Sequence, residues 1–322
     1  MKATFTEEQR ALAETARDLG AGGLAAARVM LDGGEPDDSL TAALFGGFAG
    51  VGVAEAAGGA GGGLVEVAIL LEGLGRTVTP TPFVHHILAL QVAHAAGHDV
   101  GAALAPDARW VLTPGGQTTA VPDGPTATAA VSVGDDHAVT VHRVEAASPR
   151  PGLDPTRPLA DLRLGEVVAA ARTGSPHAGL RAAAALAAEQ VGVGRGAVDL
   201  AVEYAKTREQ FGQPVGRFQA VAHQLADAFT GLELAWSLVL YACWALDAGA
   251  PDAAGAVHRA AAKAGEAAVF ACERAMQVHG GIGITWEADP HLFLRRAIAD
   301  DAWLGSARRH RQQAGAALLH RA

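Results

Sequence analysis

Aromatic and sulfur-containing residues are scarce in this chain. Phe, Trp and Tyr make up 5% of the 322 residues, and there are only two cysteines and three methionines. Since 50% of the residues are nevertheless hydrophobic, the cores must consist of Ala, Leu and Val, which let helices approach closely. The length suggests two or three lobes. Cys243 and Cys272 lie in helix-like runs without a CxxC spacing, which indicates reduced core thiols in a cytosolic protein.

Long apolar runs and an excess of positive charge are also missing. The first residues, MKATFTEEQR, contain acidic side chains and no apolar signal core. No uncharged run of about eighteen or more apolar residues stands out elsewhere, so we expect no membrane span. The formal net charge of −9 argues against nucleic acid as the main partner. Together these absences predict a cytoplasmic protein.

The most unusual stretch is Thr207–Gln219, which reads TREQFGQPVGRFQ between two long, Ala-rich segments with helical periodicity. Gly212, Pro214 and Gly216 interrupt those helices through conformational freedom and a missing amide N–H. A link between antiparallel helices needs only a few polar or Gly residues, yet this one adds charge, amides and two aromatic rings. On local features alone, a helical hairpin anchored by its Phe residues remains the alternative to a functional loop.

A second stretch, QVHGGIGITWEADPHLFLRR, begins at Gln277. The two stretches, in this order and about seventy residues apart, resemble the two C-terminal signatures of the acyl-CoA dehydrogenase family. FTEEQ at Phe5–Gln9 and LLEGLGR at Leu70–Arg76 are similar to the family's N-terminal region. The resemblance spans nearly the whole chain. It implies an FAD-dependent oxidoreductase that dehydrogenates the Cα–Cβ bond of an acyl-CoA.

Periodicity and helix breakers predict a mostly helical α+β fold in three parts. Residues 1–104 are interpreted as an N-terminal helical domain, 105–168 as a reduced antiparallel β domain, and 169–322 as a four-helix bundle. The first helix is expected over Thr6–Gly20, with Thr6 as its N-cap. The other expected elements are the helices Asp38–Gly47, Leu64–Arg76, Phe83–Gly97, Ser175–Arg208, Phe218–Gly249, Asp252–His279 and Asp289–His320, and the strands Arg109–Thr113, Ala127–Val133, Ala138–Arg143 and Asp161–Leu164.

Two patterns in the N-terminal half suggest other kinds of site. The Gly-rich stretch Val51–Gly63 could cradle a phosphate, but it lacks a GxGxxG after a strand and a Lys-Ser/Thr at its end. We interpret it as a connector, and the family resemblance implies that it faces the acyl-binding region. His85, His86 and His94 could suggest a metal, but no carboxylate lies at ligand spacing. We interpret them as ordinary helix residues and predict no metal site.

The resemblance implies that both C-terminal signatures contact FAD. Arg208 is a permanent cation with five donors in a planar fork, suited to a pyrophosphate; its alternative role is a helix-terminal charge. The matching Arg of the family reaches the pyrophosphate and adenosine of an FAD held mainly by a neighbouring subunit. The other expected contacts are Gln210, Phe211 and Gln219 in the first signature and Gln277, Val278, His279, Gly280 and Gly281 in the second. HGGIG alone could form an esterase oxyanion loop, but the chain lacks a GxSxG nucleophile elbow.

Two parts of the family's catalytic machinery are missing from the sequence. A full-length member has a longer middle domain with a TEP-x-AGSD-like segment that holds the flavin ring and the acyl thioester, and no such segment occurs here. The family's catalytic Glu, which takes the α-proton, corresponds to Leu304. An alternative Glu position on the first bundle helix, near Arg181 and Ala182, also lacks a carboxylate.

Asp300 and Asp301 are the nearest carboxylates to the missing base, one helical turn before Leu304. They are weak candidates, because a solvated or salt-bridged pair with Arg295 and Arg296 is the more economical interpretation. We therefore expect no catalytic residue in this chain.

These features predict the shortened subunit of a heteromeric acyl-CoA dehydrogenase, similar to the actinobacterial steroid-degradation enzymes that contain two copies of each of two chains. A full-length partner would supply the flavin platform and the catalytic Glu, and this chain would complete the FAD site across the interface. The resemblance also implies an acyl-CoA substrate and electron-transfer flavoprotein as the acceptor. The alternatives are a self-sufficient homo-oligomer that uses Asp300 or Asp301 as base, a non-redox acyl-CoA-binding or scaffold protein, and a hydratase, for which we find no water-activating pair.

Overall fold

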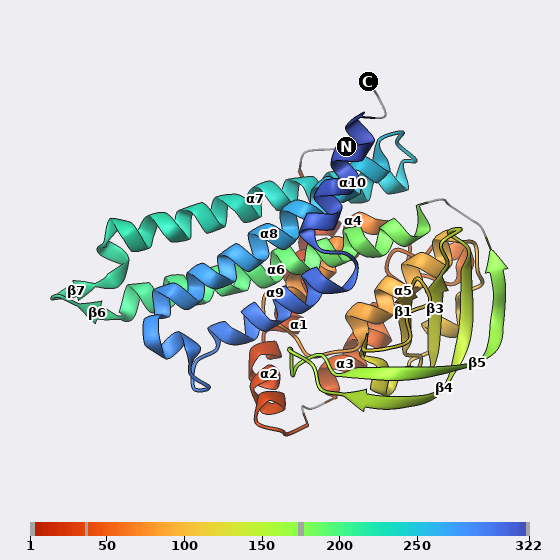
Figure 1. Cartoon of the computed structure of the whole chain (residues 1–322), viewed down its shortest axis with the longest axis horizontal. Helices are drawn as coiled ribbons and strands as arrows, with labels where there is room; N and C mark the ends of the chain where they lie inside the picture. Colours follow the sequence, from red (N-terminus) through yellow and green to blue (C-terminus); the bar gives the residue numbers. More distant parts are fainter. Residues whose placement is uncertain (1–3, 36–37, 173–176, 320–322) are drawn as a thin grey trace.

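A computed structural model of the chain describes residues 4–35, 38–172 and 177–319, and it contains three packed parts (Figure 1). The predicted N-cap at Thr6 is confirmed: its hydroxyl accepts from the backbone N–H of Gln9, and the Gln9 side chain accepts from that of Thr6. The short helix Gly23–Leu31, which follows the first helix, was not predicted. The N-terminal helices are α1 (Glu7–Gly20), α2 (Gly23–Leu31), α3 (Ser39–Gly47), α4 (Leu64–Gly75) and α5 (Phe83–Ala95).

A five-stranded sheet follows, in the order β1-β3-β4-β5-β2. The prediction that it is antiparallel throughout was wrong, because β1 and β3 are parallel, with Trp110 opposite Ala129. The Gly-Gly turn after β1 does not close a hairpin; the chain crosses instead to β2 on the far edge and returns, as a parallel pair requires. The strands are β1 (Trp110–Pro114), β2 (Val121–Pro122), β3 (Ala129–Val133), β4 (Val139–Arg150) and β5 (Leu159–Arg172), the last extending past the expected boundary at 168.

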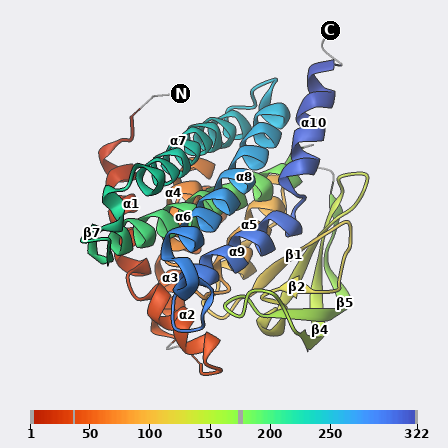
Figure 2. The same cartoon turned by 60° about the vertical axis from the view of Figure 1, so that its left-hand side comes forward.

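The C-terminal part is a helical bundle whose long helices run side by side (Figures 1 and 2). The predicted last helix is interrupted: α9 ends at Trp303, and Gly305 has a φ of +105°, which side chains with a Cβ rarely adopt. Asp301 then accepts from the backbone N–H of Ala307 and caps the next helix. The predicted limits Ser175 and His320 lie outside the described residues. The helices are α6 (Ala178–Thr207), α7 (Gln219–Asp247), α8 (Ala253–His279), α9 (Pro290–Trp303) and α10 (Ala307–Leu319).

Small residues allow the N-terminal part and the bundle to share one core, as the composition predicts. A Cβ added at Gly192 of α6 would lie 2.1 Å from the carbonyl oxygen of Glu72 on α4, so the two backbones touch there. The main core joins α4, α5 and α6 with the sheet and with α7 and α8. Cys243 and Cys272 are buried free thiols whose pKa values burial raises well above the usual range.

The stretch Thr207–Gln219 forms a two-stranded hairpin instead of a plain loop. Strands β6 (Glu209–Gln210) and β7 (Gln213–Pro214) are joined by Phe211 and Gly212, with φ values of +54° and +76°. Two consecutive positive φ values give the turn that suits the right-handed twist of a hairpin. The hairpin projects from the far left end of the bundle in Figure 1, away from the sheet.

Among the described residues, one helix is long and apolar enough to cross a membrane by length and composition alone, namely α7. It was not found as an uncharged run because it contains Asp227 and Glu233. In the structure it packs against α6 and α8 in the bundle, with 33% of its most apolar window buried.

Candidate functional site

The two signature stretches meet at one end of the bundle. The ring of Tyr204, near the end of α6, stacks on that of His279 at the end of α8, with centroids 4.3 Å apart. His279 is buried, and its Nδ1 lies 2.8 Å from the carbonyl oxygen of Ala275. This contact joins the ends of α6 and α8, from which the hairpin Arg208–Phe218 and the turn Gly280–Ile284 continue, and we call these two segments the bundle tip.

The hairpin presents its polar and aromatic groups to the outside. Arg208 is exposed, and within the described part of the chain its guanidinium has no hydrogen bond or ion pair. Phe211 is 93% exposed, which is rare for so large an apolar ring. The Gln210 amide donates only to its neighbour's carbonyl oxygen, and Gln219 is exposed at the first position of α7. These groups are therefore accessible to a ligand or to another chain.

The second stretch presents backbone instead of charge. Gln277, Gly280 and Gly281 are exposed, and a Cβ added at either glycine would meet nothing within 4 Å. Gly280 has φ +65° and ψ −143°, a combination that only glycine adopts freely. Val278 packs against a second cluster of buried apolar residues, separate from the main core. The Gln277 side chain and the two glycines therefore face open space, whereas the side chains of Val278 and His279 hold the turn in place.

Arg28 fixes the loop that follows this turn, and sequence analysis did not single it out. Its guanidinium donates to the carbonyl oxygens of Trp286 and Glu287 and to the carboxylate of Asp289. Arg295 lies over the Trp286 ring, 5.1 Å from its centroid. Because Arg28 lies in α2, more than two hundred residues earlier, no local pattern could have revealed this contact.

A buried group of charges lies where the sheet meets the bundle, and we call it the central ionic network. Arg157, from the β4–β5 connection, donates to both oxygens of Glu189 on α6, at 2.7 and 3.1 Å. Arg296 on α9 donates to Glu189 at 2.9 Å and to Asp154. Arg157 also donates to Asp300 at 3.2 Å. All five side chains are at most 3% exposed.

The interpretation of Asp300 and Asp301 as a pair with Arg295 and Arg296 was wrong. Asp300 accepts from Arg157 of the sheet, and Asp301 accepts from the backbone N–H at the start of α10. Arg295 donates to the Leu153 carbonyl oxygen. Helical spacing alone suggested the pairing with Arg295 and Arg296, but Asp300 pairs instead with Arg157 of the β4–β5 connection.

The charges of the central ionic network shift one another's pKa values. Burial alone pushes the pKa of Glu189 up, but Arg157 and Arg296 outweigh it and hold that pKa below its usual range. The pKa of Asp154 is likewise low, because Arg296 and a hydrogen bond from Thr156 outweigh burial. In contrast, burial and the charge of Glu189 raise the pKa of Asp300 well above its usual value. Asp300 is therefore the carboxyl group of the network that is protonated most readily.

The position of the family's catalytic Glu is closed. Leu304 borders a space of only about 10 Å³, shared with Leu186, Gln190 and His310. That is room for one water at most and none for an acyl chain. Leu304 itself packs against the main core.

Two larger cavities lie on the bundle's flanks. One, of about 470 Å³, is lined by the Gly-rich loop together with His94, Arg181 and Asp247. The loop's glycines at 52, 58, 61 and 62 have positive φ values, and the loop lines this cavity. The substrate-facing position that the resemblance implies stays a prediction.

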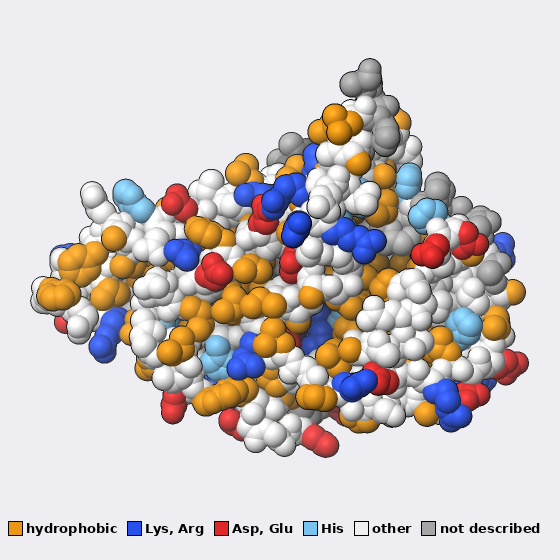
Figure 3. Space-filling view, viewed as in Figure 1, with side chains coloured by type: hydrophobic (Ala, Val, Ile, Leu, Met, Phe, Trp, Pro, Cys, Tyr) orange, Lys and Arg blue, Asp and Glu red, His pale blue; other side chains and the backbone are white. Residues whose placement is uncertain are grey.

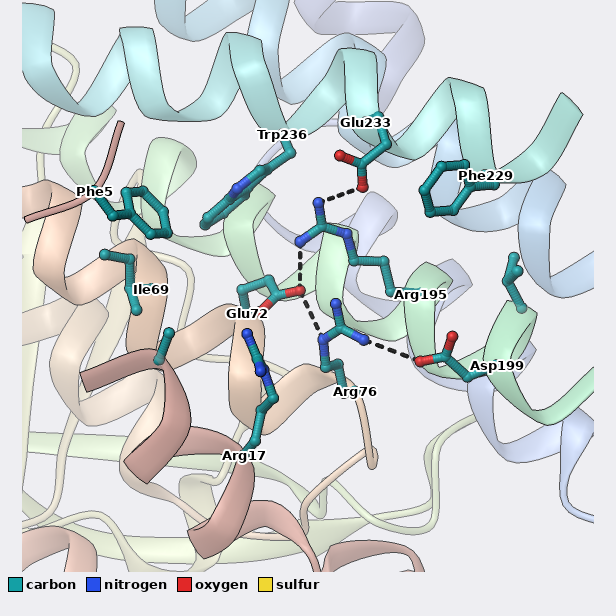
Figure 4. A pocket seen from close by; sticks show the side chains of 12 residues that line it. Phe5, Arg17, Ile69, Glu72, Arg76, Arg195, Asp199, Phe229, Glu233 and Trp236 are labelled. Carbon is teal, nitrogen blue, oxygen red and sulfur yellow. Dashed lines mark hydrogen bonds and ion pairs between the residues drawn. The ribbon is translucent and has the colours of Figure 1, made fainter. Parts of the chain in front are cut away.

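The other flank cavity, of about 270 Å³, lies among α1, α4, α6 and α7 (Figure 4). An alternating ladder of charges crosses it: Arg195 joins Glu72 to Glu233, and Arg76 joins Glu72 to Asp199. Each pair is satisfied within the chain, so the ladder ties helices together. No group of three His, Cys, Asp or Glu side chains in the described ranges is placed to hold a metal ion.

Comparison with known proteins identifies the class that this fold and these residues define. Residues 6–101 match the family model of the acyl-CoA dehydrogenase N-terminal domain, and residues 180–319 match that of the C-terminal domain. The chain belongs to the acyl-CoA dehydrogenase family, whose members are FAD-dependent oxidoreductases. The predicted family and fold are confirmed.

Individual relatives narrow the comparison. The chain is 36% identical to acyl-CoA dehydrogenase IpdE2 of Mycobacterium tuberculosis, with 95% of both proteins covered. It is 33% identical to acyl-CoA dehydrogenase FadE34 of the same organism, over 96% of this chain but only 48% of FadE34. Among solved structures, the Tcur3481-Tcur3483 steroid ACAD has a TM-score of 0.84, at 28% identity and with 98% of both chains covered.

Proposed function

We propose that this chain is the shortened subunit of a heteromeric acyl-CoA dehydrogenase, and that its bundle tip completes an FAD site held mainly by a full-length partner chain. The observation that carries the proposal is the exposed Arg208, without a hydrogen bond or ion pair in the described part of the chain, at the end of the bundle where Tyr204 stacks on His279. A permanent cation with five free donors suits the pyrophosphate of a dinucleotide. The Gly280 N–H donates to carbonyl oxygens at the end of α8, and the absence of a Cβ at Gly280 and Gly281 lets a dinucleotide approach the backbone of the turn closely.

The remaining exposed groups of the bundle tip fit the same cofactor. Phe211 offers an aromatic face for a ring of the dinucleotide, and the amides of Gln210, Gln219 and Gln277 can donate to ribose or phosphate oxygens. When bound, FAD supplies the acceptor for the hydride from Cβ of the acyl-CoA. The contribution of this chain is to bind and orient the cofactor, through its own cation, amides and turn.

The buried residues near Leu304 do not offer a carboxylate that could take the α-proton of the substrate. Leu304 cannot accept a proton, and the space beside it holds no acyl chain. Asp301 is committed to capping α10, and Asp300 is buried against Arg157. We therefore assign the carboxylate that takes the α-proton to the partner, and we do not favour a self-sufficient homo-oligomer.

Two relatives support a two-chain enzyme. The related steroid ACAD is named for two gene products, Tcur3481 and Tcur3483. The match to FadE34 leaves about half of that longer protein for a second unit. By analogy with the steroid ACAD, we propose a bulky, steroid-derived acyl-CoA as substrate and electron-transfer flavoprotein as the electron acceptor.

The test is the flavin content of the complex between this chain and a co-expressed full-length acyl-CoA dehydrogenase. We expect flavin absorbance in the complex and a loss of about tenfold or more in FAD affinity with Arg208→Ala, because charge-assisted hydrogen bonds to a phosphate are lost. Arg308→Ala is the matched control, since Arg308 is an exposed cation on α10 at the opposite end of the bundle. Unchanged FAD affinity in Arg208→Ala would overturn the assignment, as would stoichiometric flavin and dehydrogenase activity in the chain alone.

A further inference from the structure

A cavity of about 320 Å³ lies where α9 meets the loops of the sheet, apart from the bundle tip. Figure 3 shows the surface hollowed where the bundle meets the sheet. Most of the lining is apolar and includes Pro122, Leu153, Leu159, Ile298 and Trp303. The volume is within the range of small-molecule sites. We call this space the α9 cavity.

His85 forms one polar part of its wall and is partnered by the buried Asp123, which does not line the cavity. Nδ1 of His85 lies 2.6 Å from a carboxylate oxygen of Asp123, and the two residues are 1% and 4% exposed. The Trp303 ring holds the imidazole edge-on, with centroids 4.5 Å apart. Burial and the charge of Arg157 lower the pKa of His85, which keeps the ring neutral. With its proton on Nδ1 toward Asp123, Nε2 is an acceptor that has no hydrogen bond among the described residues.

Asp300 forms the second polar part of the wall. Its Oδ1 accepts from Arg157, but its Oδ2 is buried with no hydrogen-bond partner in the described part of the chain. A carboxyl group accepts hydrogen bonds when ionised and can donate one when protonated, and the raised pKa of Asp300 favours the protonated form. Buried polar atoms without partners are rare in folded proteins, so Oδ2 points to a group that the chain itself does not supply.

We infer that the α9 cavity binds a small, neutral, mostly apolar molecule that carries a hydroxyl group. A hydroxyl donates one hydrogen bond and accepts others, so it can serve both the acceptor on His85 and the donor on Asp300. A pure hydrocarbon would leave both unsatisfied. A carboxylate would place a further negative charge beside Asp154, and the Arg157 cation of the same wall is already paired with Glu189 and Asp300. This inference does not rest on the proposed FAD contact, because the two sites share no residue.

The experiment titrates the purified full chain with phenol, toluene and benzoate, three probes with one ring and different polar groups, and follows binding by saturation-transfer NMR. We expect saturable binding of phenol in the millimolar range, and binding of toluene and benzoate weaker by about tenfold, the effect of one hydrogen bond. Leu153→Trp should abolish phenol binding by filling the rim, since Leu153 is 47% exposed and can change without disturbing the core. Leu318→Trp, at a 60% exposed position on α10, is the control.

A second variant separates hydrogen bonding from folding. Asp300→Asn keeps the shape and a donor, so phenol binding should stay within about threefold of the wild type, whereas Asp300→Ala should weaken it by about tenfold. The inference is overturned by the absence of saturable phenol binding, by equal binding of all three probes, or by phenol binding that Leu153→Trp leaves unchanged.

Discussion

Arginine is exposed and unpaired at the bundle tip, whereas it is buried and paired in the central ionic network. Arg208 has no ion pair in the described part of the chain, while Arg157 and Arg296 share Glu189 and bind Asp300 and Asp154. Burying a guanidinium is costly unless carboxylates and hydrogen bonds surround it, so the network must be complete within the chain. An exposed guanidinium has no such requirement and stays available for a ligand. The contrast separates cations that hold the fold from one that can serve a cofactor.

The largest expected effect is the loss of Glu189. Glu189→Gln leaves Arg157 and Arg296 buried without their shared ionised partner, so the free energy of unfolding should fall by about 3–5 kcal/mol. Urea unfolding followed by circular dichroism measures it. Glu203→Gln is the control, because Glu203 is exposed and pairs only with Lys206 on the same helix. Equal stabilities for the two variants would show that the network does not hold the sheet to the bundle.

The second prediction uses the opposite pKa shifts within the network. Because the folded pKa of Asp300 is raised, its contribution to stability is full below the unfolded pKa of about 3.9 and is lost as the pH rises through the folded pKa. Asp300→Asn removes this loss. Its free energy of unfolding should therefore rise relative to the wild type as the pH increases above about 4, by up to about 1.4 kcal/mol per pH unit within that window.

Urea unfolding at a series of pH values measures this difference. Glu189 and Asp154, whose pKa values are lowered, contribute stability above their unfolded pKa values and lose it as the pH falls through the folded ones. Glu189 and Asp154 are present in both the wild type and Asp300→Asn, so their contributions to the pH dependence largely cancel in the comparison. Parallel pH profiles for wild type and Asp300→Asn would mean that Asp300 is ionised in the folded state.

The third prediction concerns Arg208 and the fold. Arg208→Ala should change the chain's own free energy of unfolding by less than about 0.5 kcal/mol, because an exposed side chain without partners contributes little. Arg296→Ala should destabilise the chain severely, as the removal of a buried ion-pair partner does. Thermal unfolding of both variants checks the contrast. A marked destabilisation by Arg208→Ala would assign that residue to the fold.

The smallest expected effect is in the ladder of Figure 4. Its charges are paired like those of the central ionic network but are partly exposed. The Asp199 side chain is 68% exposed and pairs only with Arg76. Asp199→Asn should change the free energy of unfolding by less than about 0.5 kcal/mol, because burial raises the pKa of Asp199 and offsets the attraction of Arg76, and by less still in high salt, which screens exposed charges. Urea unfolding at two salt concentrations tests this. A loss comparable to that of Glu189→Gln would mean that the ladder is as protected from water as the central ionic network.

The sequence by itself determined most of the helices, the Thr6 cap, the Ala-rich close packing and the two family signatures. These depend on residues close together in the chain, where helical periodicity, capping chemistry and glycine positions leave a local pattern. The signatures also indicated that Arg208, Gln210 and Phe211 belong to one segment. Their shared exposure at the bundle tip follows from the Phe211–Gly212 turn.

Only the tertiary structure decided which distant residues meet. Glu189 joins Arg157 and Arg296, His85 joins Asp123, and Arg28 holds the loop near Trp286, all between residues far apart in the chain. The parallel pairing of β1 and β3 is of the same kind. A single acidic or basic residue in a helix has many partners within reach of a folded chain. Burial selects among them, because inside a protein an unpaired charge is far more costly than in water.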